Sequence, residues 1–228
     1  MKNNSLEERS TGADRIVQIA TALFAEHGFH GVSTREIAAA TELSVATVHH
    51  HVGSKRELYL KVYKSLLDAA ESFFHDIVAQ VETADLQDPL VRAHLPAQLV
   101  DSFVDLVAKN PVWARLFVRQ WLDKPEELRD VEADLSLPLY RKLYEVLLIA
   151  QEAGIIRLTV DPWLIMRSVE WLVYGYFTAG TFDWDQWRAD PFAEGNLERF
   201  KTFMGEYIFR MLNIAPADTI SAPVTSPD

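Results

Sequence analysis

The sequence predicts an all-α protein. Apolar residues recur at three- and four-residue spacing along almost the whole chain, which is the period of one helix face. No stretch shows the sustained apolar-polar alternation of a half-buried strand, and only nine of the 228 residues are glycine. Serine, or a proline preceded by aspartate or asparagine, stands where most of the periodic segments begin. We therefore expect about nine helices.

The first helix is predicted over residues 13–27. Its apolar residues fall on one face, and Gly28 follows as a left-handed stop. The polar residues 1–12 before it are expected to form a disordered arm.

Three serines then mark helix starts. Ser33 and Ser54 each stand three residues before a glutamate, which is the pattern of a capping box, and Ser44 lies between them. These starts predict two short helices and one long helix of about seven turns. The predicted ranges are 34–41, 45–50 and 55–82.

Proline at the first helical position marks most of the later helices, each time after a residue able to cap. The predicted ranges are 89–109, 111–122, 162–180 and 191–213. A further segment, 125–153, contains Pro138, which should break or kink it. Residues 215–228 lack periodicity and are expected to form a disordered tail.

Composition excludes several classes of protein. The chain has no cysteine, so it can form no disulfide framework, thiolate nucleophile or cysteine metal site. It has no phosphate-binding glycine loop, Gly-x-Ser-x-Gly elbow or His-Glu-x-x-His pair, which argues against an enzyme. Without a signal core or a long apolar run, we expect a cytoplasmic protein. We expect no cofactor and no metal, because the histidines at 49–51 fan out around a helix.

The formal net charge of −11 is unevenly distributed. Residues 1–60 hold six Lys and Arg against seven Asp and Glu, while the remainder holds sixteen against twenty-six. Any DNA contact by the first part must therefore use a few placed cations and backbone amides.

Residues 34–41 and 44–51 have the length and spacing of a helix-turn-helix, whose second helix lies in the major groove. Ile37, Leu43 and Val48 are placed to form a small shared core. A generic helical hairpin has the same spacing and remains the alternative.

Three motifs carry a resemblance to a known family: Ala-Leu-Phe-Ala-Glu-His-Gly at 22–28, Ser-Thr-Arg-Glu-Ile-Ala at 33–38 and Gly-Ser-Lys-Arg-Glu-Leu at 53–58. This segment resembles the DNA-binding domain of TetR-family transcriptional regulators. The resemblance implies an N-terminal three-helix DNA-binding domain, residues 13–57, and a larger helical effector-binding and dimerisation domain, residues 58–214. It also implies a homodimer that binds a double-stranded DNA operator and a small-molecule effector.

The resemblance assigns DNA contacts to the helix-turn-helix and to the start of the following helix. Phosphate contacts fall at the start of its first helix, at His49 and at Lys55. Base-edge contacts fall at the start of its second helix, and His50 contacts the groove edge. The implied contact residues are Thr34, Arg35, Ser44, Val45, Ala46, Thr47, His49, His50 and Lys55. His51 is expected to have a packing role. Glu42 and Val52 depart from the family pattern, which usually has glycine and phenylalanine at these positions, and His49 stands where it has tyrosine.

Aromatic residues at helical spacing in the second part suggest an apolar effector pocket with a polar end, although core packing is the better explanation for any single one of them. The candidate lining residues are Trp113, Phe117, Gln120, Trp121, Arg167, Trp171 and Tyr174. Arg167 and Glu170, one turn apart, could instead neutralise each other. The apolar last helix suits a dimer interface, with an intramolecular core helix as the alternative.

The sequence thus predicts a ligand-responsive transcriptional regulator, a repressor released from a pseudo-palindromic operator by a partly apolar effector. The alternative is a helical partner-binding module that keeps the fold but not operator binding.

Overall fold

The computed structural model describes residues 12–85, 88–123, 129–152, 156–157, 159–183, 185–193 and 195–214. The described residues form nine α-helices and one short β-hairpin, so the helical fold class is confirmed. The predicted arm, except Gly12, and the predicted tail lie outside the described residues. The elements are α1 Gly12–Gly31, α2 Thr34–Thr41, α3 Val45–Val52, α4 Lys55–Thr83, α5 Pro89–Lys109, α6 Pro111–Asp123, α7 Arg129–Glu152, α8 Pro162–Ala179, β1 Thr181–Asp183, β2 Gln186–Ala189 and α9 Asn196–Met211.

Both capping boxes form as the sequence predicts. The Ser33 hydroxyl accepts from the Glu36 amide at 3.2 Å, while the Glu36 carboxylate accepts from the Ser33 amide at 2.6 Å. The same exchange between Ser54 and Glu57 starts α4. Each box satisfies amides that have no partner within the helix.

The two predicted interruptions have different outcomes. Gly28 interrupts the first helix as predicted, with non-helical backbone angles of φ 72° and ψ 174°, and a short helical segment follows it to Gly31. Pro138 does not break α7, which runs through it. Pro138 lies on the exposed side of the helix, where the lost hydrogen bond leaves a carbonyl accessible to water.

The helix predicted over 191–213 is also wrong at its start. Asp190 caps a single turn, accepting from the Phe192 amide at 2.9 Å, but α9 begins only at Asn196. The chain before it forms the antiparallel pair β1 and β2, which no part of the sequence analysis predicted. Strands of three and four residues are too short to produce a readable alternation.

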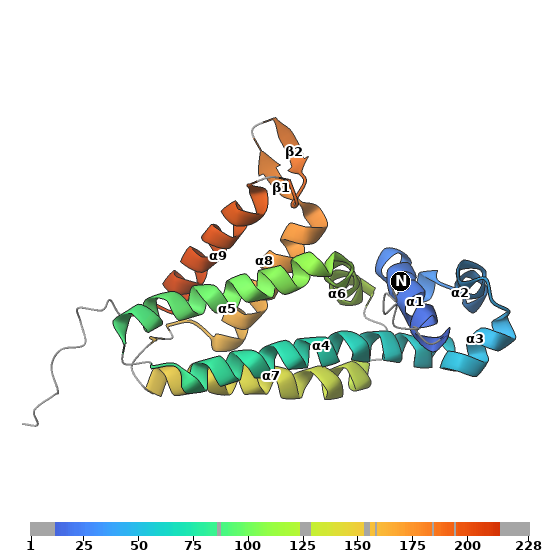
Figure 1. Cartoon of the computed structure of the whole chain (residues 1–228), viewed down its shortest axis with the longest axis horizontal. Helices are drawn as coiled ribbons and strands as arrows, with labels where there is room; N and C mark the ends of the chain where they lie inside the picture. The colour runs from blue at the N-terminus through green and yellow to red at the C-terminus, as the bar shows by residue number, and fades with distance from the viewer. Residues whose placement is uncertain are drawn as a thin grey trace, which may run out of the picture.

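The helices form two packed units (Figure 1). At one end, α1–α3 and the first turns of α4 enclose a core that includes Phe24, Ile37 and Leu58. Beyond it, α4 and α7 lie side by side, α5 crosses over them, and α8 and α9 rise away and carry the hairpin. A second core there includes Val104 and Met204.

Some apolar residues of the last helix are buried in the core, and others lie at the surface. Met204 and Ile208 are buried in the second core, whereas the Phe203 side chain is 50% exposed. A Cβ at Gly205 would lie 3.3 Å from that of Ala97, so α9 packs closely on α5. Much of α9 is therefore an intramolecular core helix. None of the helices in the described ranges combines the length and apolar character needed to cross a bilayer.

Candidate functional site

A tight turn fixes α2 against α3. Glu42 adopts the left-handed conformation, φ 59° and ψ 31°, and its amide donates to the Ala39 carbonyl at 3.2 Å. Ile37 and Val48 are buried beneath the turn, and Leu43 is half-buried against the same core, as predicted. The pair thus has the geometry of a helix-turn-helix, with α3 on the outside of the molecule (Figure 1).

The predicted DNA-contacting residues lie on or beside this outer surface. The side chains with exposed positions are Arg35, Ser44, Val45, Ala46, His49 and His50, and those of Thr34, Thr47 and Lys55 are half-buried. Ser44 caps α3, because its hydroxyl accepts from the Thr47 amide at 3.0 Å and pairs with the Thr47 hydroxyl at 2.8 Å. These two side chains therefore hold each other at the start of α3.

Lys55 and His51 have surroundings that the sequence did not predict. The Lys55 ammonium lies 4.4 Å from the centre of the Phe29 ring, a cation–π contact that positions it at the start of α4. The His51 side chain, for which a packing role is expected, is exposed, and the centre of its ring lies 5.6 Å from that of His50. Val48 and Val52, one turn apart, occupy the inner face of α3, and His51 lies one position off that face.

The described residues of the second unit enclose at least two cavities. The first, called here the polar cavity, has a volume of about 240 Å³ and lies between α4, α6, α7 and α8. Five of the predicted pocket residues line it: Phe117, Gln120, Trp121, Arg167 and Tyr174.

The two other predicted pocket residues do not line this cavity. Trp113 packs against the core of the N-terminal unit. Trp171 is 53% exposed. It follows Glu170 directly on α8, so it lies about 100° around the helix from the face that carries Arg167, Glu170 and Tyr174.

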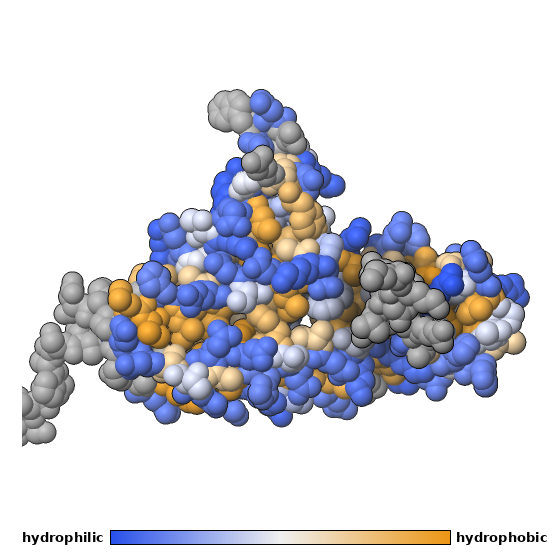
Figure 2. All heavy atoms as spheres, viewed as in Figure 1, coloured by the Kyte–Doolittle hydropathy of each residue, from blue (hydrophilic) through white to orange (hydrophobic). Residues whose placement is uncertain are grey.

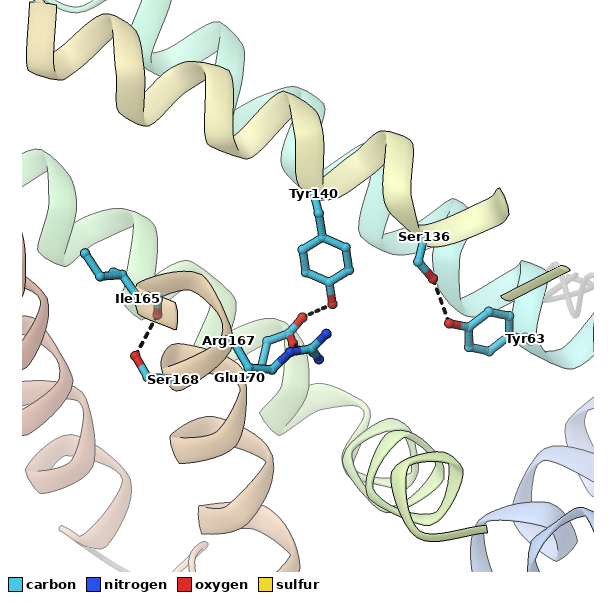
Figure 3. Close-up of polar contacts among 7 residues, drawn as sticks. All are labelled: Tyr63, Ser136, Tyr140, Ile165, Arg167, Ser168 and Glu170. Carbon is cyan, nitrogen blue, oxygen red and sulfur yellow. Dashed lines mark hydrogen bonds and ion pairs between the residues drawn. The ribbon is translucent and has the colours of Figure 1, made fainter. Parts of the chain in front are cut away.

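A buried carboxylate forms the inner wall of the polar cavity (Figure 3). Glu170 accepts hydrogen bonds from the Tyr140 hydroxyl and from the Arg167 guanidinium, the latter at 2.6 Å. Burial raises the pKa of Glu170, and the Arg167 charge opposes that rise. Burial, reinforced by the Glu170 charge, also raises the pKa of Tyr140, so its phenol stays a donor. Arg167 and Glu170 thus pair as the alternative interpretation expected, and they do so while lining the cavity.

A direct link joins this cavity to the helix that enters the N-terminal unit. Tyr63 of α4 and Ser136 of α7 both line the polar cavity, and their hydroxyls lie 2.8 Å apart (Figure 3). Tyr63 is buried, one residue after a member of the N-terminal core. Sequence reasoning missed both residues, because only the packing of α4 on α7 brings them together.

The second cavity, called here the apolar cavity, has a volume of about 210 Å³ and lies between α4, α5, α7, α8 and α9. Its walls are almost wholly hydrophobic, and apolar residues are visible between α5 and α4 in Figure 2. Tyr140 and Glu170 line both cavities. The sequence does not reveal this cavity, because five separate helices contribute to its walls.

Helix α6 connects the polar cavity to the N-terminal unit. Phe117 lines the cavity and also packs against the N-terminal core. Two positions later, the Arg119 guanidinium donates to the Glu26 carbonyl of α1 at 2.7 Å. A Cβ at Gly28 would lie 1.8 Å from the Asp123 carboxylate, so glycine allows α1 to approach the end of α6 closely.

Within the parts of the chain that the structure describes, no three His, Asp or Glu side chains are grouped closely enough to hold a metal ion.

Comparisons with known proteins agree with this geometry. The family model of bacterial regulatory proteins of the tetR family matches residues 16–62, which span α1 to the start of α4. The HTH-type transcriptional repressor AcnR of Corynebacterium efficiens is 34% identical over 77 residues, which are 32% of this chain and 40% of that protein. The match thus spans about two fifths of that relative's length.

Solved structures extend the likeness over the whole fold. The fatty acid degradation regulator FadR from Bacillus halodurans has 17% sequence identity and a TM-score of 0.66, over 92% of this chain and 100% of that one. AibR, in complex with isovaleryl coenzyme A and operator DNA, has 19% identity and a TM-score of 0.59, over 87% and 98%. Residues 16–62 thus match the tetR family of bacterial regulatory proteins, and the chain as a whole shares the fold of FadR and AibR.

Proposed function

We propose that the protein is a ligand-responsive DNA-binding transcriptional regulator, a repressor that a small effector releases from a pseudo-palindromic operator. The observation that carries the proposal is the helix-turn-helix, whose α3 lies on the outside with its capped start and polar face exposed. AcnR is named a repressor, and AibR is described with operator DNA and isovaleryl coenzyme A. The family is one of regulators, not of enzymes.

In this proposal α3 enters the major groove. Val45 and Ala46 contact base edges, apolar contact with a thymine methyl being within their reach, and Thr47 contacts a base or a phosphate. Arg35 and Lys55 contact phosphates on either side, Lys55 at the positive end of α4.

The protein acts as a homodimer, so that two copies of α3 read two half-sites. Exposed apolar side chains on α8 and α9, Leu164, Trp171 and Phe203, support a contact between copies. A Cβ at Gly175 would meet nothing within 4 Å, which leaves room for a partner helix beside α8. Because the proposed target is operator DNA, we place the protein in the cytoplasm.

Selection of bound duplexes from a random DNA pool tests the proposal. We expect enrichment of a pseudo-palindrome, and weaker binding of it by Thr47→Ala and by Lys55→Ala. Lys64→Ala is the matched control, because Lys64 is an exposed lysine of the same helix, nine positions further on. Lys55→Ala should also reduce the salt dependence of binding by about one counterion per protomer, and Lys64→Ala should not. Absence of any enriched sequence, with and without effector, would favour the partner-binding module.

A further inference from the structure

The polar and apolar cavities meet at one pair of side chains. Tyr140 and Glu170 belong to the walls of both, and a hydrogen bond joins them. An elongated ligand with one apolar and one polar end would fill both cavities by passing this pair.

The polar groups around this junction are arranged to hold an anion. Glu170 is the only acidic side chain among the described residues that line the polar cavity, and two donors converge on its carboxylate. The Arg167 guanidinium is held in place between aromatic rings, 5.4 Å from the centre of Tyr140 and 5.7 Å from that of Trp121. Arg129, on the same wall, adds a second cation.

The Glu170 carboxylate thus occupies a position where the surrounding donors would also bind an anionic group of a ligand. A cationic ligand group would meet Arg167 and Arg129, whereas an anionic group would take over the donors that now bind Glu170. The displaced Glu170 can take up a proton in its buried position, because burial already raises its pKa.

We propose that the effector is an acyl amphiphile, whose chain occupies the apolar cavity and whose anionic head displaces Glu170 from Arg167 and Tyr140. Glu170 is then an internal competitor for the head group. The regulatory consequence rests on the proposed function, but ligand binding itself does not.

Calorimetry with four ten-carbon probes, each below its micelle concentration, tests the head-group charge on the full chain. The probes are decanoate, decanoyl-coenzyme A, decanol and decyltrimethylammonium. We expect the tighter of the two acyl anions to bind at least tenfold more tightly than decanol or the ammonium probe. Preference for decanoate identifies a free acid, and preference for the thioester identifies a coenzyme A conjugate. Equal or tighter binding of decanol or of the ammonium probe, or no binding of either anion, overturns the proposal.

Three variants separate competition from a structural role. Glu170→Gln keeps the size of the side chain and removes its charge, so we expect severalfold tighter binding of the preferred anion and no change for decanol. Arg167→Gln should weaken binding of that anion at least tenfold, and Arg115→Gln, an exposed arginine of α6, is its control. Ala150→Phe should fill the apolar cavity and abolish binding of every probe.

Circular dichroism of each variant checks the fold before binding is interpreted. If Glu170→Gln weakens anion binding, or changes anion and decanol binding equally, Glu170 is not a competitor and the proposal is wrong. Binding that follows the predicted charge order but leaves operator affinity unchanged would refute the proposed function and leave the ligand site intact.

Discussion

Glu42 is a non-glycine residue in the left-handed conformation, and replacing it by glycine should stabilise the protein. An L-residue in this conformation is disfavoured by about 1–2 kcal/mol. Glycine removes that penalty but adds about 0.5–1 kcal/mol of unfolded-chain entropy. The side chain is exposed and the two turn hydrogen bonds come from backbone amides, so the substitution removes no packing or turn bond. We therefore expect Glu42→Gly to raise the free energy of unfolding by about 0.5–1 kcal/mol.

Urea and thermal unfolding measure this difference. For a chain of this size, the expected gain corresponds to a Tm increase of about 1–4 °C. The control is Ala40→Gly, two residues earlier and also exposed but within α2. There glycine should destabilise by about 0.5–1 kcal/mol. The reasoning is refuted if Glu42→Gly destabilises the protein, or if the two glycine variants shift stability in the same direction.

The same position distinguishes strain from charge in DNA binding. Glu42→Gln removes the negative charge beside the proposed DNA surface and keeps the left-handed strain. We expect both Glu42→Gln and Glu42→Gly to strengthen operator binding, and only Glu42→Gly to stabilise the fold. Tighter binding by the glycine variant alone would instead assign the effect to the turn geometry.

Three further outcomes can be measured. Tyr63→Phe removes the hydroxyl contact between α4 and α7, so it should lower the free energy of unfolding by about 0.5–1.5 kcal/mol. It should also reduce the effector-induced release of operator DNA, measured by a fluorescence anisotropy titration. Hydrogen bonds to the capping serines lower the pKa of Glu36 and Glu57 below the ordinary 4.5, so the stabilisation that these hydrogen bonds give is present above that value and lost as the pH falls through the lowered pKa. Amide chemical shifts at the two capping serines, followed from pH 6 to 3, should move at a midpoint below 4.5. Gly28→Ala should destabilise the protein by more than about 1 kcal/mol, as at other strained backbone positions, because the new Cβ would meet the Asp123 carboxylate. Adding Asp123→Ala should remove this clash and partly restore the stability of the double variant.

Local signals predicted local structure well. The starts of α2, α4, α5 and α8 follow from capping groups within three residues of each start, because the helix end and its cap are neighbours in sequence. The start of α9 was mispredicted by the same kind of signal. Asp190 caps a turn there, but whether a turn continues depends on what the following residues pack against.

The site was less predictable, because its residues come together only through tertiary packing. Arg167, Trp171 and Tyr174 all have helical spacing suited to a pocket, yet only the packing of α7 and α6 on one side of α8 decides which of them face the cavity. Tyr63 and Ser136, 73 positions apart, have no sequence signal that relates them. The apolar cavity likewise depends on five helices, and no single helix reveals it.

In the proposed function, two connections could carry the effect of an effector to the N-terminal unit. Helix α4 is continuous from the cavity wall at Tyr63 to Lys55, and α6 reaches from Phe117 to the contact of Arg119 with α1. A rotation of α4 alone would have to break or stretch the α6 contact, because both helices pack on the same N-terminal core. If an effector releases the operator, we therefore expect the N-terminal unit to move as a body relative to α7 and α8, where the Tyr63–Ser136 contact crosses the boundary. Two arrangements are compared, one that binds the operator and one that does not. An effector needs only to bind the second arrangement more tightly than the first. The ratio of its affinities for the two sets the largest change in operator affinity that it can produce.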